Sequence, residues 1–270
     1  MRIGIFYDHL LDAARQEQLE MSEIAARAAL SGIRYADVNS GDLCAHPQEL
    51  RAMLQGAGME IGAVIGRFDF AHGHGMEEAR ALVRLARNEK IAQLLVIPGF
   101  LAPGDERQQV MEEICRHLRP LVDEARQWNV SVTLEDYDST DAPYATWEEL
   151  VYLMRETPGL GCTFDTGNFL YSGEDALTAL EQLLRYVQRV HCKDRALSGR
   201  AGDEGTETPA GSRLYSAPVG GGVIPVRAAL EKLTANGYHG DLTIEHYGSP
   251  CMLADMTASA AYLRGLAQEK

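Results

Sequence analysis

The stretch VSVTLE at residues 130–135 is typical of a buried parallel strand, because it is largely apolar and ends in a single carboxylate, Glu135. Three later stretches have the same form: LGCTFD at 160–165 ends in Asp165, VQRVH at 187–191 in His191, and DLTIE at 241–245 in Glu245. A carboxylate buried there without a partner would cost several kcal/mol. Four ligand-type side chains at successive strand ends therefore predict one shared cation.

Around these stretches the chain repeats one unit, in which an amphipathic helical segment leads through a turn into a short apolar strand. Gly32, Gly58, Asn129 and Gly237 stand at turns where a helix end needs positive φ. Strands are expected to begin near residues 3, 35, 60, 93, 131, 161, 188 and 242. Eight strands separated by helices predict an α/β fold, a single (β/α)8 TIM barrel in one domain over residues 1–270. No GxGxxG motif follows the first strand, which disfavours a dinucleotide cofactor.

Composition narrows the class of protein. The 270 residues are 46% hydrophobic and 24% charged, enough for one large core of the usual barrel size, roughly 250 residues. A net charge of -14 argues against a nucleic-acid partner, which needs a basic face. No apolar stretch approaches the roughly 18 residues of a membrane helix. Five cysteines without a C-x-x-C pair, and an N-terminus without a leader pattern, predict a cytoplasmic protein; a homo-oligomer is compatible with the sequence.

One interval breaks the regular spacing. Residues 195–222, after the seventh expected strand, are rich in Gly, Ser, Thr, Glu and Pro and show little apolar periodicity. They predict a long loop. Because the loops that follow barrel strands lie on the catalytic face, this loop is either a lid over the substrate or a passive surface insertion.

Strand alternation predicts which side chains point into the barrel. Inward pairs are Thr133 with Glu135, Thr163 with Asp165, His191 with Lys193, and Thr243 with Glu245, whereas the intervening apolar residues face the helices. Three carboxylates and one imidazole form a hard donor set. Such a set suits Mn²⁺ best among the metals considered, with Mg²⁺, Co²⁺ or Zn²⁺ as alternatives.

The motifs at these positions resemble those of the xylose isomerase-like barrel superfamily, among the sugar phosphate isomerase/epimerase proteins. The resemblance lies in LEDYDS at Glu135, FDTGNF at Asp165, VHCKD at His191, VGGGVIP at 219–225 and LTIEHYG at Glu245, which occur in the family's order. It implies that Glu135, Asp165, His191 and Glu245 bind one divalent metal ion. It also implies that Glu135 and Glu245 are the catalytic acid/base pair.

A site of this kind supports proton transfer next to a carbonyl group. A cation bound to the carbonyl and hydroxyl oxygens of a small sugar, keto-sugar or sugar phosphate makes the neighbouring C–H acidic and stabilises an enediolate. Two carboxylates can then remove and return a proton, which gives an epimer or an aldose–ketose isomer. We therefore expect a metal-dependent isomerase or epimerase of a small polyhydroxy carbonyl substrate. The alternatives are a lyase, such as an inosose-type dehydratase, and a non-catalytic metal- or sugar-binding barrel subunit.

Four further residues are candidates for substrate binding. Lys193 is expected at the barrel mouth, where it either contacts a substrate oxygen or forms a salt bridge to a barrel carboxylate. Asn168 stands where the ketose 3-epimerases that this family includes commonly have histidine, and Arg195 resembles their substrate arginine at a different spacing. Arg67 could hold a phosphate or carboxylate, or lie exposed on the surface.

The segment RFDFAHGHG contains two histidines that could bind a second metal ion. His72 and His74 resemble metal ligands of the superfamily's DNA-repair endonucleases, but those enzymes need several further histidines and a basic face. A solvated loop is the expected role of this segment.

Overall fold

The computed structural model describes residues 1–268 as two compact units. Unit 1 comprises Met1–Gly62, Asp165–Gly167 and the chain from Arg189 onward, and unit 2 comprises Ala63–Phe164 and Asn168–Gln188. Three strands therefore pass from one unit into the other along the chain. They are β3 (Glu60–Arg67), β6 (Gly161–Asp165) and β7 (Val187–Ala196).

The strands of unit 1 are parallel and pair in the order β7-β10-β1-β2. With β7 from Arg189, they are β1 (Ile3–Phe6), β2 (Tyr35–Asn39) and β10 (Leu242–Glu245). In this register Leu242 lies beside both Ile3 and Val190. A Cβ at Gly4 would lie 1.9 Å from the ring of Tyr35, so only glycine fits at this position.

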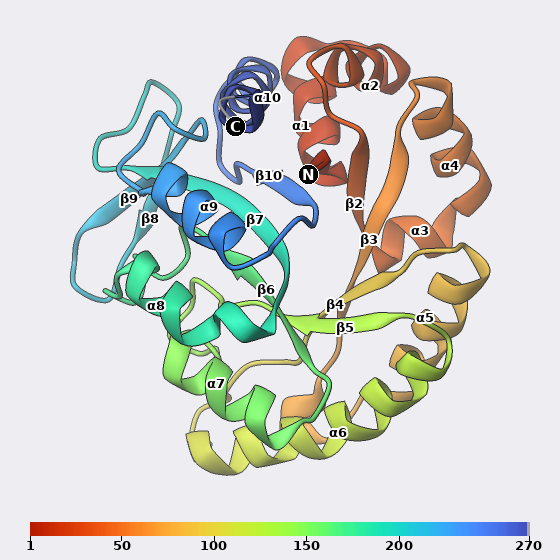
Figure 1. The fold of residues 1–270 in the computed structure, drawn as a ribbon, viewed down its shortest axis with the longest axis vertical. Coiled ribbons are helices and arrows are strands. Elements are labelled where there is room, and N and C mark those ends of the chain that lie inside the picture. The colour runs from red at the N-terminus through yellow and green to blue at the C-terminus, as the bar shows by residue number, and fades with distance from the viewer. Residues whose placement is uncertain (269–270) are drawn as a thin grey trace. The chain divides into compact units, whose positions relative to one another are not determined.

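The helices of unit 1 cover its strands with their apolar faces. They are α1 (Tyr7–Glu17), α2 (Met21–Leu30), α3 (Ser40–Ala45), α4 (Pro47–Gly56), α9 (Val226–Ala235) and α10 (Met252–Gln268). On α1 the buried positions His9, Leu10 and Ala13 follow helical spacing. Figure 1 shows α10 beside α1 and α2, and contacts join all three helices.

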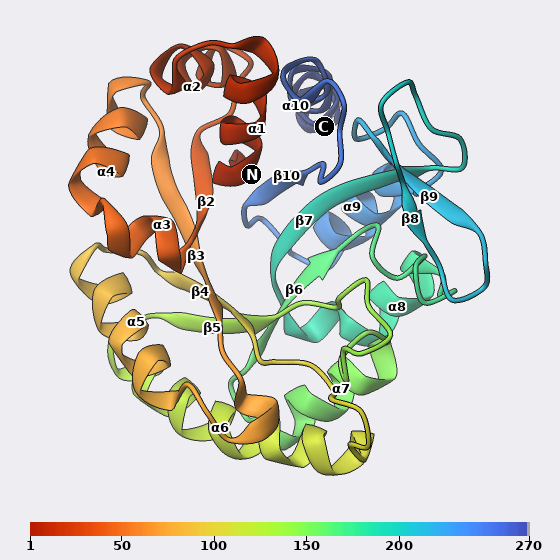
Figure 2. The same cartoon turned by 180° about the vertical axis from the view of Figure 1, so that it is seen from behind.

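After β7 the chain forms an antiparallel extension. The strands are β8 (Thr206–Glu207) and β9 (Arg213–Ala217); β9 pairs with the end of β7, where Arg195 lies opposite Ser216. Figure 2 shows β8 and β9 side by side. The long loop expected over residues 195–222 thus contains two short strands that the sequence did not indicate. Both residues of β8 are exposed, so this strand leaves no apolar pattern in the sequence.

Asp194 ties the glycine-rich segment that follows β9 back to β7. Its carboxylate accepts backbone N–H bonds from Gly220 (2.9 Å), Gly222 (3.0 Å) and Ile224 (3.0 Å). A Cβ at Gly222 would lie 2.3 Å from the backbone oxygen of Arg195, so only glycine allows this approach.

Unit 2 contains four parallel strands in the order β3-β4-β5-β6. Between β3 and β6 lie β4 (Gln93–Ile97) and β5 (Ser131–Leu134). The helices are η1 (Phe70–His72), α5 (Met76–Asn88), α6 (Arg107–Gln127), α7 (Trp147–Glu156), α8 (Ala176–Leu183) and η2 (Leu184–Tyr186). In Figures 1 and 2, α5 to α8 follow one another around these strands, and each contacts the next.

The sequence-based element positions agree with the structure. Parallel strands begin at residues 3, 35, 60, 93, 131, 161, 187 and 242, four in each unit. The four predicted turn residues have positive φ: Gly32 (101°), Gly58 (74°), Asn129 (57°) and Gly237 (85°). The single domain over residues 1–270 stays a prediction.

Candidate functional site

Alternation along β2, β7 and β10, together with the end of β6, places polar side chains of unit 1 in two groups. Arg189, Asp37, Tyr35 and Thr243 form the first group, in which Arg189 donates to both oxygens of Asp37 at 2.9 and 2.5 Å. Thr243 donates to the same carboxylate at 2.7 Å, and the Arg189 guanidinium lies 4.8 Å from the centre of the Tyr35 ring. All are buried. Arg189 and Asp37 therefore compensate each other's charge inside unit 1.

The second group, here called the His191 cluster, consists of Asp165, His191, Lys193 and Glu245. Their exposed fractions are 0%, 1%, 4% and 5%. Lys193 Nζ donates to Glu245 Oε1 at 2.7 Å, and His191 Nδ1 lies 3.3 Å from Glu245 Oε2. The ring of Phe6 packs edge-on against His191 at 4.8 Å. Unit 1 thus brings together three of the four predicted metal ligands.

The neighbouring Lys193 and His191 determine the ionisation state of Glu245. Burial alone would raise the pKa of this carboxyl, but the Lys193 ammonium and the His191 ring hold its pKa well below the usual range. Glu245 is therefore an anion. Its Oε1 is engaged by Lys193, and its Oε2 faces His191.

Two neutral imidazoles flank the end of β10. His9 Nε2 accepts the backbone N–H of His246 at 2.7 Å, and the two rings stack with centroids 6.2 Å apart. Burial lowers the pKa of His9 to about 3 and that of His246 to about 4. His9 therefore stays a hydrogen-bond acceptor at neutral pH and fixes the backbone next to Glu245.

The donors of the His191 cluster fit a divalent cation. Ligand atoms of Asp165, His191 and Glu245 lie within 4.8 Å of one another. Two ligand atoms each about 2.1 Å from one cation are about 3.0–3.4 Å apart at octahedral or tetrahedral angles. The 3.3 Å separation of His191 Nδ1 and Glu245 Oε2 has this value. Carboxylate oxygens with one imidazole suit magnesium, manganese or zinc.

Unit 2 carries the other predicted site residues. Glu135 follows β5 directly and is 8% exposed. Asn168 is buried, and its Nδ2 donates to the backbone oxygen of Asp136 at 2.9 Å. The resulting link holds the loop after β5 against the start of the segment after β6.

Unit 2 also contains a cluster of its own, here called the Tyr144 cluster. It consists of Arg67, Phe100, Tyr137 and Tyr144. Arg67 ends β3 and is exposed, and its Nη1 donates to the Tyr137 hydroxyl at 3.4 Å. Phe100 lies 5.1 Å from Tyr137 and 6.1 Å from Tyr144, between ring centroids. Loops after β3, β4 and β5 therefore meet in one aromatic and basic patch.

The remaining sequence-based candidates have other surroundings. Lys193 forms the salt bridge that was the alternative to substrate contact, and its contact with substrate stays a prediction. Arg195 is buried in the pairing of β7 with β9. His72 Nδ1 lies 2.6 Å from Asp69 and His72 Nε2 3.0 Å from Asp105. Among the side chains of residues 1–266, no group of three or more potential metal ligands includes His72 or His74.

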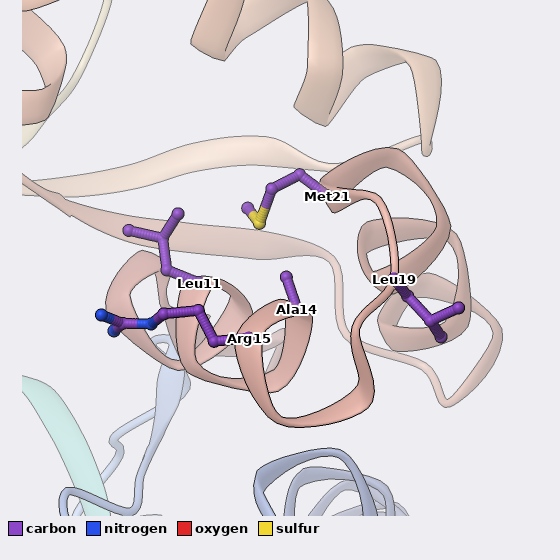
Figure 3. A pocket seen from close by; sticks show the side chains of 5 residues that line it. All are labelled: Leu11, Ala14, Arg15, Leu19 and Met21. Atoms are coloured by element: carbon purple, nitrogen blue, oxygen red, sulfur yellow. The ribbon is translucent and has the colours of Figure 1, made fainter.

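A separate hollow of about 370 Å³ lies on α1 and α2. Figure 3 shows its lining by Leu11, Ala14, Arg15, Leu19 and Met21, which is mainly aliphatic and offers no metal ligand. None of the helices within residues 1–268 has both the length and the apolar character needed to span a bilayer.

Sequence reasoning missed Asp37, Tyr137 and Tyr144. Asp37 stands on the inward face of β2, so a carboxylate in the otherwise apolar YADV could have indicated it. The two tyrosines lie in the irregular segment between β5 and α7, where no periodicity marks a side chain as buried.

Comparison with known proteins finds relatives in sequence and solved structures with a similar fold. An inosose dehydratase of Bacillus anthracis is 26% identical over 126 residues, which are 47% of this chain; the match spans only 41% of that relative's length. The crystal structure titled IolI protein with a bound zinc atom superposes with a TM-score of 0.77 at 14% identity, covering 100% of this chain and 99% of that chain. The structure of an L-ribulose 3-epimerase superposes with a TM-score of 0.75 at 16% identity, covering 99% and 95%.

The profile of one protein family, described as the xylose isomerase-like TIM barrel, matches residues 19–266. This confirms the predicted fold class, a (β/α)8 barrel, and the resemblance read from the motifs. The chain belongs to the xylose isomerase-like TIM barrel family.

Proposed function

We propose that this protein is a divalent-metal-dependent isomerase or epimerase of a small polyhydroxy carbonyl compound. The observation that carries the proposal is the buried His191 cluster. Its donor atoms have the spacing of metal ligands, and the chain belongs to the xylose isomerase-like TIM barrel family. The bound zinc of the IolI protein and the activity of the L-ribulose 3-epimerase support it by analogy.

Glu135 is proposed as the fourth ligand. It follows β5 as Asp165 ends β6 and Glu245 ends β10, and barrels of this kind carry their active sites at the carboxyl ends of the strands. Manganese is the metal we expect, with magnesium, cobalt or zinc as alternatives.

Each residue then has a defined task. When bound, the cation supplies Lewis-acid stabilisation of the negative charge that develops on the carbonyl oxygen. Glu135 removes or returns the proton on the neighbouring carbon from one side, and Glu245 does so from the other. Lys193 fixes the orientation of Glu245 through the 2.7 Å bond. Phe6, packed on His191, keeps water from that side of the ring.

A dehydratase is the second candidate, favoured by a specific observation. Lys193 places an ammonium donor beside Glu245, and such a donor can protonate a departing β-hydroxyl group. The matched region of the inosose dehydratase relative points the same way. Both candidates share the first proton abstraction and differ in the step that follows.

A substrate screen in deuterated buffer tests the proposal. Keto-sugars, ketose phosphates and inososes are incubated with the manganese-loaded protein and with a Glu135→Gln variant, and products are read by NMR and mass. Deuterium at the inverted or neighbouring carbon supports an epimerase or isomerase, whereas loss of water with deuterium incorporation supports the dehydratase. Absence of both exchange and product throughout the panel would favour a non-catalytic sugar- or metal-binding protein.

A further inference from the structure

The carboxyl ends of three adjacent strands in unit 1 bring together three polar side chains that the proposed chemistry does not use. Asp8 follows β1 in the first turn of α1, Asn39 ends β2, and Tyr247 lies two residues beyond β10. These strands pair in the order β10-β1-β2, and barrels of this kind bind their substrates at the carboxyl ends of the strands. The three residues are here called the Asp8 group.

Two donors converge on one oxygen of the Asp8 carboxylate. Asn39 Nδ2 donates to Asp8 Oδ2 at 2.8 Å, and the Tyr247 hydroxyl donates to the same atom at 3.0 Å. In the part of the chain that the structure describes, no hydrogen bond reaches Asp8 Oδ1 and no cationic side chain forms a salt bridge with this carboxylate. The side chain is only half-buried, so Oδ1 keeps its capacity to accept hydrogen bonds from a ligand.

Aromatic contacts place the Asp8 group next to the His191 cluster. The Phe6 ring contacts the His191 ring at 4.8 Å and the Tyr247 ring at 5.6 Å, between centroids. The Tyr247 ring also packs against His9 at 4.6 Å and is 39% exposed. Both groups belong to unit 1. A ligand can therefore meet the His191 cluster and the Asp8 group within this unit alone.

The charge near the Asp8 group is negative. Burial and the Asp8 carboxylate both raise the pKa of Asp42 on α3, which marks two acids close together. A phosphate or carboxylate would meet like charge here, which is unfavourable. A hydroxyl group, in contrast, can donate to Asp8 Oδ1 while its oxygen accepts the second N–H of the Asn39 amide.

We propose that Asp8, Asn39 and Tyr247 form a subsite for the hydroxyl groups of an uncharged polyol chain, at the end of the substrate remote from its reacting carbonyl. The inference rests on the proposed function and narrows its substrate class to polyhydroxy compounds without a phosphate or carboxylate at that end. The exposed Tyr247 ring offers an apolar face to the C–H groups that lie between the hydroxyls.

Three unreactive polyols test the subsite. Glycerol, xylitol and xylitol 5-phosphate each carry vicinal hydroxyls that can approach the metal, and they lack the carbonyl that the reaction needs. Their dissociation constants are measured by isothermal titration calorimetry with the manganese-loaded protein and with the metal-free protein. The variants are Asp8→Asn and Tyr247→Phe, which keep the shape of the side chain. The matched control is Asp12→Asn on the same helix, where Asp12 forms an ion pair with the exposed Arg15.

The manganese-loaded parent should bind xylitol roughly tenfold or more tightly than both glycerol and xylitol 5-phosphate. Asp8→Asn should weaken xylitol binding roughly tenfold and should narrow the gap to the phosphate, because the repelling charge is removed. Tyr247→Phe should weaken xylitol binding about threefold, since it removes one donor to Asp8 and keeps the ring. Both variants should keep the parental Mn²⁺ affinity, and Asp12→Asn should resemble the parent throughout.

Absence of xylitol binding, equal binding of xylitol and its phosphate by the parent, or parental xylitol binding in Asp8→Asn would overturn the inference. Metal-dependent polyol binding that does not involve Asp8 would overturn the subsite and leave the proposed function standing. If xylitol binds the metal-free protein as tightly as the manganese-loaded protein and still depends on Asp8, the subsite stands and the proposed metal-dependent function fails.

Discussion

The His191 cluster of unit 1 and the Tyr144 cluster of unit 2 treat buried polarity in opposite ways. In the first, the charged groups meet opposite charges at short range, as Lys193 does with Glu245, and Arg189 compensates Asp37 nearby. In the second, the buried Tyr144 hydroxyl has no hydrogen-bond partner among the side chains of residues 1–266, and Arg67 lies exposed. The first arrangement compensates each buried charge, and the second leaves a buried hydroxyl uncompensated.

The largest effect should come from the proposed acid/base pair. Glu135→Gln and Glu245→Gln keep the shape of the side chain but remove the proton acceptor, so turnover should fall about 10²- to 10⁴-fold. Turnover is measured at saturating metal with the substrate that the screen identifies. Glu156→Gln, at an exposed salt bridge on α7, is the control and should keep the parental rate. Parental turnover in both acid/base variants would replace the two-carboxylate mechanism with one based on Lys193.

Breaking charge compensation in unit 1 should cost stability. Arg189→Met leaves Asp37 buried without its guanidinium, which should lower the free energy of unfolding by about 3–5 kcal/mol in urea titrations. The control is Arg119→Met, because Arg119 and Glu156 are each 48% exposed and such pairs contribute about 1 kcal/mol or less. Equal losses in the two variants would show that the buried layer is no different from a surface ion pair.

The segment that carries Tyr137 and Tyr144 ends at the N-cap of α7, Thr146. Removal of this cap should lower the stability less than the loss of Arg189. The Thr146 hydroxyl oxygen accepts the backbone N–H of Glu149, and the Glu149 carboxylate accepts the backbone N–H of Thr146. Together these bonds form a capping box at the start of α7. Thr146→Ala should therefore destabilise the protein by about 1 kcal/mol in thermal or urea unfolding, whereas Thr146→Ser should be close to neutral. A loss as large in the serine variant would argue against the cap.

The smallest effect is a pH dependence in unit 2. His72 bridges Asp69 and Asp105, and these two hydrogen bonds raise its pKa above the ordinary value of 6.5. The bridge therefore adds stability that is fully present below pH 6.5 and is lost as the pH rises through the higher folded-state pKa. NMR titration should show this raised pKa in the parent and a lower one in Asp105→Asn. An identical His72 titration in both proteins would contradict the bridge.

Much of the barrel could be predicted because each parallel strand is a short apolar run with a turn before it. VSVTLE and LGCTFD show both features, and their strands begin at the predicted residues 131 and 161. The strand-end positions of Asp165, His191 and Glu245 followed from such runs, and the structure places these side chains together. The cytoplasmic location, the oligomeric state and metal binding by these three residues and Glu135 stay predictions.

Other features depend on contacts that the sequence order hides. Arg189 and Asp37 are 152 residues apart, and nothing local indicates that they pair. Tyr144 lies in DAPYATW, where its burial depends on packing against Phe100 from another loop. The sequence did not indicate β9, the antiparallel partner of β7, because RLYSA is short and the strand with which it pairs lies about twenty residues earlier in the chain.

The central claim is that Asp165, His191 and Glu245, with Glu135, hold one divalent cation. Metal content and Mn²⁺ dissociation constants of the purified parent, Asp165→Asn and His191→Ala test it most directly, with His72→Ala as a histidine control outside the cluster. We predict one metal ion per chain in the parent and in His72→Ala. The two ligand variants should bind Mn²⁺ more than about a hundredfold more weakly, since even the outer partners of a metal site are worth about 10- to 100-fold. Parental metal content and affinity in both ligand variants would contradict the account.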